Sequence, residues 1–434
     1  MHFKRSLLFS LLTLLFMGLA VTAAADSPFV EAEVSVLFTF NGEQPGDGFG
    51  WISENLGDLN SDGVNDFIIT APFYSVDGTN TEGKFYVYSG QDGALLHSDV
   101  GSGFALLGYS ADAAGDVNAD GTPDYLVSGP APDGGVLVYS GADHTVLLSI
   151  TGQPGTAFGA DVAGAGDVNG DGSDDFIVGA TQASASYAQA GQVTLFSGAD
   201  GTALWTVDGF SEGAALGGGV GLVGDVNGDG VPDQVAGARG GGEKGRGEAY
   251  VLSGVDGSII YSLNPVGLPG SPPTFALFHA SGAGDVNNDG VPDVYIGDYN
   301  AQRGQHQGQN RVPTGTGRVY IFSGADGSRL YVLDAEQNGD GFGPGRGIGD
   351  VNHDGYDDLI TAAYTSSAGA PFGGKAYIHS GRDGQVLRTM TGTVAGALLG
   401  VDAISVGDIN DDGLADYGVT GDGVVHIVAG TPLP

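Results

Sequence analysis

The chain has 434 residues, of which 81 are glycine and none is cysteine. Glycine costs about 1 kcal/mol at each position inside a helix, so a chain with about 19% glycine against a usual 7% excludes a helical bundle. The formal net charge of −38 disfavours nucleic acid and favours cations as partners. The lack of cysteine excludes disulfides, thiolate metal sites and thiol catalysis.

Residues 1–25 have the pattern of a secretory signal peptide. Lys4 and Arg5 precede an apolar run from Leu7 to Val21, and three alanines then provide the small residues of a cleavage site. An uncleaved membrane anchor is the alternative, but the run is short for a bilayer span of about 20 residues. We therefore expect a secreted or extracytoplasmic protein, in the periplasm or at the cell surface, whose mature chain 26–434 has no membrane span.

An acidic repeat dominates the rest of the chain. The pattern Asp-x-Asn-x-Asp-Gly-x-x-Asp occurs seven times between Asp58 and Asp416, and successive copies begin 51 to 65 residues apart. Each copy is followed by a short apolar run, then by an alternating run that ends in a turn, often with Asp-Gly. With the segment before the acidic loop, every repeat supplies four short strands. The sequence therefore predicts an all-β fold, a seven-bladed β-propeller that occupies 26–434 as one domain.

The two ends of the chain distinguish a closed ring from an open solenoid. The seventh repeat ends at Val424–Val428 and lacks its last strand, whereas Val34–Phe40 is a strand without a repeat of its own. We expect this N-terminal strand to complete the last blade. Pairing of the N-terminal strand with the last repeat closes a ring, whereas an open solenoid needs a separate cap at each end.

The acidic loops have the composition of calcium sites, because calcium takes six to eight oxygen ligands and a glycine at the sixth position permits the sharp turn. Ordinary Asx turns do not require three carboxylates, which repel one another without a counter-ion. An EF-hand is excluded because its twelfth position needs glutamate, where the first loop has Ile69. We expect up to seven Ca²⁺ ions, held by side chains and by the backbone carbonyl of the seventh position. The predicted ligands are Asp58, Asn60, Asp62, Val64, Asp66; Asp116, Asn118, Asp120, Thr122, Asp124; Asp167, Asn169, Asp171, Ser173, Asp175; Asp225, Asn227, Asp229, Val231, Asp233; Asp285, Asn287, Asp289, Val291, Asp293; Asp350, Asn352, Asp354, Tyr356, Asp358; and Asp408, Asn410, Asp412, Leu414, Asp416.

The chain resembles the FG-GAP repeat family, which includes the propeller of integrin α chains. The Phe-Gly pair or its leucine variant stands at Phe49-Gly50, Leu107-Gly108, Phe158-Gly159, Leu216-Gly217, Phe342-Gly343 and Leu399-Gly400, and the fifth repeat departs with Phe278-His279. The resemblance implies a seven-bladed propeller with calcium loops on one face and ligand binding on the opposite face. It implies an extracellular interaction or adhesion module, although integrin α chains usually keep the calcium loop in only some blades.

No group of residues has the pattern of a catalytic site. Gly209–Gly213 matches the G-x-S-x-G elbow but lies between blades, where no helix follows. Gly78–Lys84 and Gly369–Lys375 resemble phosphate loops but lack the following Ser or Thr. His353 occupies a variable position of the sixth acidic loop and is expected to face solvent. The prediction is a non-enzymatic module, with a carbohydrate-binding propeller or a polysaccharide-active enzyme as the alternative.

The stretches between the second and third strands vary most and are expected on the face opposite the calcium loops. Two of them, in the fourth and fifth repeats, carry a basic and aromatic set: Arg239, Lys244, Arg246, Tyr299, Arg303, His306 and Arg311. On so acidic a chain this set is a candidate site for an extracellular protein or an anionic glycan. The alternative is a pair of solvated loops whose arginines offset nearby carboxylates. We expect a monomer.

Overall fold

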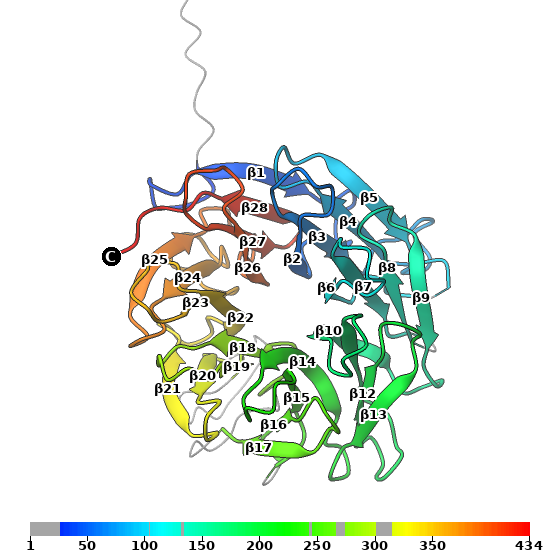
Figure 1. Ribbon diagram of the computed structural model, residues 1–434. Helices are drawn as coiled ribbons and strands as arrows, with labels where there is room; N and C mark the ends of the chain where they lie inside the picture. The colour runs from blue at the N-terminus through cyan, green and yellow to red at the C-terminus, as the bar shows by residue number, and fades with distance from the viewer. Residues whose placement is uncertain (1–26, 104, 132–133, 243–244, 266–273, 301–314) are drawn as a thin grey trace, which may run out of the picture.

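The computed structural model describes residues 27–434 except 104, 132–133, 243–244, 266–273 and 301–314. In this described part of the chain, twenty-eight strands form seven four-stranded antiparallel sheets, arranged as blades around a central channel (Figure 1). The prediction of a seven-bladed β-propeller is confirmed. The predicted signal peptide lies outside the described residues, and no helix in the described part of the chain has the length and apolar character to span a bilayer.

Strands run in chain order from the channel to the rim in the first six blades. The strands of these blades are β2 (Ser53–Gly57), β3 (Asp66–Ala71), β4 (Lys84–Tyr88), β5 (Leu95–Val100); β6 (Ser110–Gly115), β7 (Asp124–Gly129), β8 (Gly135–Tyr139), β9 (Val146–Thr151); β10 (Phe158–Gly166), β11 (Asp175–Ala180), β12 (Gln192–Phe196), β13 (Ala203–Asp208); β14 (Leu216–Gly224), β15 (Asp233–Ala238), β16 (Glu248–Leu252), β17 (Ile259–Leu263); β18 (Ala280–Gly284), β19 (Asp293–Asp298), β20 (Arg318–Phe322), β21 (Arg329–Asp334); β22 (Phe342–Gly349), β23 (Asp358–Ala363), β24 (Lys375–His379), β25 (Val386–Thr391).

The seventh blade combines both ends of the chain. Its inner strands are β26 (Ala403–Gly407), β27 (Asp416–Gly421) and β28 (Val424–Val428), and its outermost strand is β1 (Val36–Asn41). β1 pairs with β28 in antiparallel register. The ring of Phe40 in β1 lies 5.6 Å from that of Phe67 and 4.3 Å from that of Tyr88 in the first blade. The N-terminal strand thus contacts the first blade while it hydrogen-bonds to the last.

The hydrophobic core lies between blades. The second strand of every blade is buried at all six positions, because its sheet is covered on both faces by the neighbouring sheets. This arrangement explains the continuous apolar runs that follow the acidic loops. Seven clusters of buried residues fill the seven interfaces of the described structure, and one of them packs Phe49 and Phe67 of the first blade against Ile404 and Ile427 of the last.

Glycine permits the innermost strands to approach one another around the channel. A Cβ atom added to Gly164 would overlap the carbonyl oxygen of Ala113 in the preceding blade, and one added to Gly221 would overlap that of Ala280 in the next blade. Larger side chains at these points would force neighbouring blades apart. The high glycine content therefore serves close backbone contact as well as turns.

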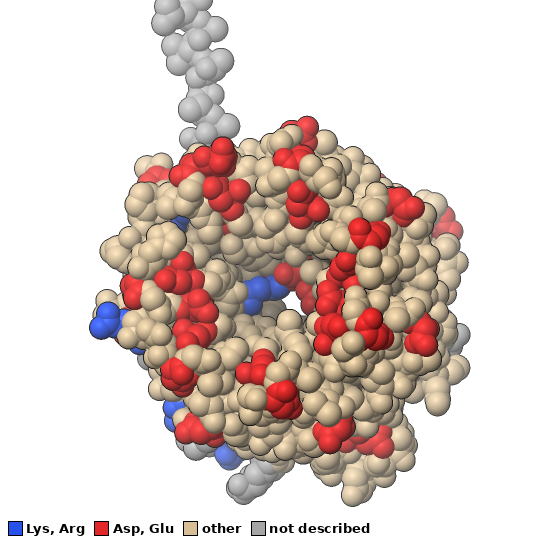
Figure 2. Space-filling view, in the orientation of Figure 1, with Lys and Arg blue, Asp and Glu red and all other residues tan. Residues whose placement is uncertain are grey.

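Strand order gives the ring two different faces. The acidic loops, which connect first and second strands, share one face with the turns between third and fourth strands, and we name it the loop face. The stretches between second and third strands and the blade-to-blade connections lie on the opposite face, which we name the connection face. Figure 2 shows acidic side chains in patches around the whole ring, and the ring hollowed at its centre.

Ring closure should depend on the interface between the first and last blades. Replacing Ile427, which is fully buried there, with Ala should lower the free energy of unfolding by about 2 to 5 kcal/mol, because it leaves a cavity between the two blades. Urea denaturation measures this change. Val386→Ala is the control, since Val386 is 48% exposed on an outer strand and should change stability by less than about 0.5 kcal/mol. Equal effects of the two variants would contradict a closed ring.

Candidate functional site

Each acidic loop contains two backbone positions with left-handed dihedral angles, the fourth and the sixth. In the first loop Ser61 has φ 60° and Gly63 has φ 89°, and in the sixth loop His353 has φ 62° and Gly355 has φ 90°. The sixth position is glycine in all seven loops, whereas the fourth varies. His353 is exposed, as predicted.

Side-chain oxygens of the loop fold its backbone into a tight turn. In the first loop Asp58 accepts hydrogen bonds from the backbone N–H groups of Asp62 and Gly63, at 3.1 and 2.8 Å. Asn60 accepts from the Asp62 N–H at 2.9 Å, and Asp62 accepts from the Val64 N–H at 2.9 Å. Bonds of the same kind recur in the other loops. The three side chains are thereby held on a short, ordered loop.

The aspartate at the ninth position ties the loop to the turn between third and fourth strands. Asp66 is fully buried and accepts from the N–H of Leu59 at 3.0 Å and from the N–H of Gly90 at 3.1 Å. The equivalent aspartates do the same in the next five blades, and in the seventh blade Asp416 accepts from the N–H of Gly430, which follows β28. Burial disfavours their charged form: it raises the pKa of Asp66, Asp124, Asp175 and Asp358 to about 6 and that of Asp293 to about 7, and it also raises the pKa of Asp233 and Asp416.

The glycine of that turn allows the loop to pack against it. A Cβ atom added to Gly90 would overlap the carbonyl oxygen of Asn65, the eighth residue of the first loop. The same overlap occurs at Gly141, Gly198, Gly254, Gly324 and Gly381. The recurring Ser-Gly pair, which the sequence indicates as a turn, is therefore also a contact surface for the acidic loop.

A side chain added at the turn glycine should disturb the packing of the acidic loop. Gly198→Ala should lower the free energy of unfolding by about 1 to 3 kcal/mol, because the added methyl group must displace the carbonyl of Asp174. Thermal or urea denaturation measures the loss. Ala199→Ser is the control, since Ala199 is exposed in the same turn. If Gly198→Ala is as stable as this control, the close packing of loop and turn is wrong.

The loop residues have the donor chemistry of a calcium site. Their carboxylate and amide oxygens are the ligands that a hard cation prefers. Oδ1 of Asn287, at the third position of the fifth loop, is buried without a hydrogen-bond partner. The ion pairs among described residues leave the loop aspartates without a basic partner. In the described part of the chain, however, no three His, Asp or Glu side chains converge closely enough to hold a metal. The donor set fits calcium, and the metal ligands remain a prediction.

A charged network crosses the central channel. Arg346 of β22 forms ion pairs with Glu54 of β2 and with Asp402 before β26, the latter at 3.0 Å. Asp402 also accepts from the backbone N–H of Ser53 at 3.1 Å. The pKa of Glu54 is raised, chiefly because burial disfavours its charge. One guanidinium thus joins the sixth, seventh and first blades.

Another buried carboxylate, that of Asp161 in β10, links the second, third and fourth blades. It accepts from the Ser110 hydroxyl at 2.7 Å and from the Val220 N–H at 2.8 Å. Burial raises the pKa of Asp161 to about 7. An aspartate in the unfolded chain has a pKa of about 3.9, so the folded protein retains a proton that the unfolded chain releases between about pH 4 and 7. Ionisation of Asp161 therefore lowers stability as the pH rises through this window, with the full loss above pH 7.

Asp161→Asn should remove this pH dependence while preserving a hydrogen-bonding side chain. The stability of the variant relative to the wild type should increase from pH 5 to pH 8, as measured by urea denaturation at each pH. Glu212→Gln is the control, because Glu212 is an exposed carboxylate away from the channel. A difference between Asp161→Asn and wild type that is constant with pH would contradict the raised pKa.

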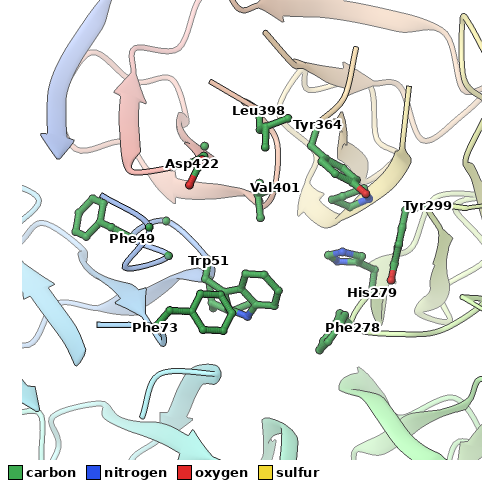
Figure 3. A pocket seen from close by; sticks show the side chains of 16 residues that line it. Phe49, Trp51, Phe73, Phe278, His279, Tyr299, Tyr364, Leu398, Val401 and Asp422 are labelled. Atoms are coloured by element: carbon green, nitrogen blue, oxygen red, sulfur yellow. The ribbon is translucent and has the colours of Figure 1, made fainter. Parts of the chain in front are cut away.

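An aromatic pocket opens at the connection-face end of the channel. It has a volume of about 380 Å³, and Figure 3 shows aromatic rings on opposite sides of one open space. Its aromatic and imidazole lining comprises Phe49, Trp51, Phe73, Phe278, His279, Tyr299 and Tyr364, from the first, fifth and sixth blades. The ring centroids of Trp51 and Phe278 lie 6.2 Å apart, so residues of non-adjacent blades meet across the channel mouth.

The sequence prediction of a partner site on this face includes one residue of the pocket. Tyr299 lines it, and Arg239 is exposed near Tyr299, where its charge opposes the rise in the tyrosine pKa that burial causes. Arg246 is half-buried. Lys244, Arg303, His306 and Arg311 lie outside the described residues. The sequence analysis missed the aromatic lining, although Trp51 directly after the first Phe-Gly pair could have indicated it.

The structure places the sequence motifs for catalysis in ordinary structural positions. Ser211 of the G-x-S-x-G match lies in the connection between two strands, β13 and β14, rather than in the strand-to-helix turn that the elbow requires. The lysines of the two phosphate-loop matches are ion-paired: Lys84 with Glu43 at 2.6 Å, and Lys375 with Glu336 at 2.8 Å.

Comparison with known proteins agrees with the repeat analysis. The FG-GAP repeat model matches residues 49–88, 158–196 and 347–379, in the first, third and sixth blades. FG-GAP repeats are therefore detected in three blades of the propeller, and the predicted resemblance to FG-GAP and integrin alpha propellers is confirmed. It is 32% identical to Integrin alpha-PS3 of Drosophila melanogaster over 165 residues, which is 34% of this chain and 15% of that protein. It is 30% identical to Integrin alpha-5 of Xenopus laevis over 209 residues, or 44% and 20% of the two chains. The chain is thus homologous to integrin alpha chains and spans a fifth or less of their length.

Two solved structures share the fold at low sequence identity. BBS1N, crystallised in complex with ARL6DN, has a TM-score of 0.55 and 10% identity, covering 92% of this chain and 97% of its own. Sqt1 of Saccharomyces cerevisiae has a TM-score of 0.52 and 13% identity, covering 86% and 82%. At these identities the likeness concerns the fold alone.

Proposed function

We propose that this protein is an extracellular, calcium-binding interaction module that acts by binding rather than by catalysis. The observation that carries the proposal is the complete acidic loop in all seven blades of an FG-GAP propeller. Homology to integrin alpha chains supports a role in interaction or adhesion. A carbohydrate-binding propeller is the second candidate, and the aromatic pocket favours it over a polysaccharide-active enzyme.

Each loop would hold one calcium ion through the side chains of its first, third, fifth and ninth positions and the carbonyl of its seventh. In the first loop these are Asp58, Asn60, Asp62, Asp66 and Val64. The ion would offset the mutual repulsion of the three carboxylates. Its role is therefore to stabilise the loop face, while the connection face remains free for a partner.

Calcium should bind with a stoichiometry of several ions per chain, up to seven, and should stabilise the fold. Native mass spectrometry in calcium gives the number of ions, and chelation should lower the melting temperature measured in millimolar calcium. Asp167→Asn combined with Asp171→Asn should remove one ion and leave the others. Magnesium at equal concentration serves as the control for ion type. A stoichiometry of zero or one, or an unchanged melting curve in chelator, would contradict the proposal.

A further inference from the structure

The fifth blade departs from the other six at the edge of the aromatic pocket. In five blades the second residue of the Phe-Gly or Leu-Gly pair is a glycine with φ between 83° and 95°, and in the sixth blade it is Gly343 with φ 156°. In the fifth blade the equivalent pair is Phe275-Ala276, because the N–H of Ala276 donates to the carbonyl of Gly297 as the N–H of Gly50 donates to that of Thr70, and Ala276 has φ 56°. The sequence alignment of Phe278-His279 with the Phe-Gly pair is therefore wrong by three residues. Phe278 follows the true pair by two residues and has φ 68°, in the left-handed region that favours glycine.

A bulky aromatic residue in the left-handed region is strained, and such strain is concentrated at functional sites. The position of Phe278 is fixed, because its N–H donates to the carbonyl of Gly218 at 2.8 Å. Its ring is half-buried and contacts Trp51 and Tyr109 at the channel mouth. The strained backbone of Phe278 thus places its aromatic ring in the pocket.

Trp51 presents a fixed apolar surface to the same pocket. Its indole Nε1–H donates to the carbonyl of Tyr109 at 3.0 Å, which uses the polar edge of the ring and prevents rotation. The ring of Phe73 packs edge-to-face against it at 5.4 Å. The aromatic surface is therefore ordered before any ligand binds, which reduces the entropy lost on binding.

Polar groups stand around this apolar surface without partners in the described structure. His279, Tyr299 and Tyr364 line the pocket, and their ring nitrogens and hydroxyls make no hydrogen bond to another described residue. Burial lowers the pKa of His279 to about 4, so its imidazole is neutral and offers one donor and one acceptor. Asp422 adds an exposed carboxylate at the rim. Donors and acceptors around aromatic faces suit a ligand that has both apolar and hydroxyl-bearing surfaces.

Charges of both signs lie near the pocket. Asp402 opposes the fall that burial causes in the pKa of His279 more strongly than Arg346 adds to it, and Arg239 lies near Tyr109 and Tyr299. The pocket volume of about 380 Å³ falls at the small end of ligand sites, which range from about 300 to 1,000 Å³. The ligand should therefore be compact.

We propose that this pocket binds a saccharide, with a sugar ring against Trp51 and Phe278 and its hydroxyls bonded to His279, Tyr299 and Tyr364. This inference rests on the proposed function as a binding module and specifies the ligand class of its connection face.

The two tryptophans permit a direct test. In a Trp205→Phe background Trp51 is the sole tryptophan, so its fluorescence reports the pocket. The calcium-loaded protein is titrated with cellohexaose, maltohexaose, chitohexaose and hexagalacturonate. At least one should change the emission saturably. Phe278→Gly should weaken that binding at least tenfold while its melting temperature stays at or above that of the background, because glycine relieves the strained backbone. Tyr187→Ala, an exposed aromatic on the same face, should bind like the background.

Four results would overturn the saccharide site. One is the absence of binding by all four oligosaccharides at 10 mM. Another is unchanged binding in Phe278→Gly. The third is a lower melting temperature of Phe278→Gly with intact binding, which would make Phe278 structural. Capture of a peptide in place of a sugar would also exclude it. If calcium binds and no sugar does, this inference fails while the proposed module stands, whereas a chain that binds no calcium fails at the earlier proposal.

Discussion

The structure depends on one packing constraint: a four-stranded blade cannot bury both of its faces by itself. The second strand of every blade is buried along its whole length only because a neighbouring sheet covers each side. Seven blades therefore stabilise one another only when the last also meets the first. The pairing of β1 with β28 and the cluster around Phe67 and Ile427 make that contact. The core is distributed over seven equivalent interfaces rather than gathered at a centre, which leaves the channel open for a polar network.

The acidic loops are attached to this core through their ninth residue. Asp66 and its equivalents are buried, and they accept one hydrogen bond from the loop and one from the turn of the third and fourth strands. Turn glycines such as Gly90 allow the two backbones to touch. The loop face is consequently uniform from blade to blade. The stretches of the opposite face are free of this attachment, so they can differ between blades without disturbing the calcium-type loops.

The connection face differs from blade to blade because of small residue changes near the Phe-Gly pair. Six blades have glycine at the second position of the Phe-Gly or Leu-Gly pair, and the fifth has Ala276, with Phe278 two residues later in the left-handed region. The ring of Phe278, together with Trp51 and Tyr299, lines an aromatic pocket beside the bridge of Arg346, Glu54 and Asp402. A repeat scaffold can therefore acquire an individual site through a single strained residue, because the remaining six blades preserve the ring.

The sequence by itself determined the number of blades, the strands of each and the loops with calcium-type donors, because these features are local and repeat with a fixed pattern. It also located the family resemblance and the face on which the chain varies. Only the tertiary structure decided that Phe275-Ala276, and not Phe278-His279, is the Phe-Gly equivalent of the fifth blade, since that depends on backbone hydrogen bonds and angles. The aromatic pocket likewise appeared only in three dimensions. Trp51 and Phe278 are 227 positions apart in the sequence, and no spacing relates them, because they meet only when the ring closes across its channel.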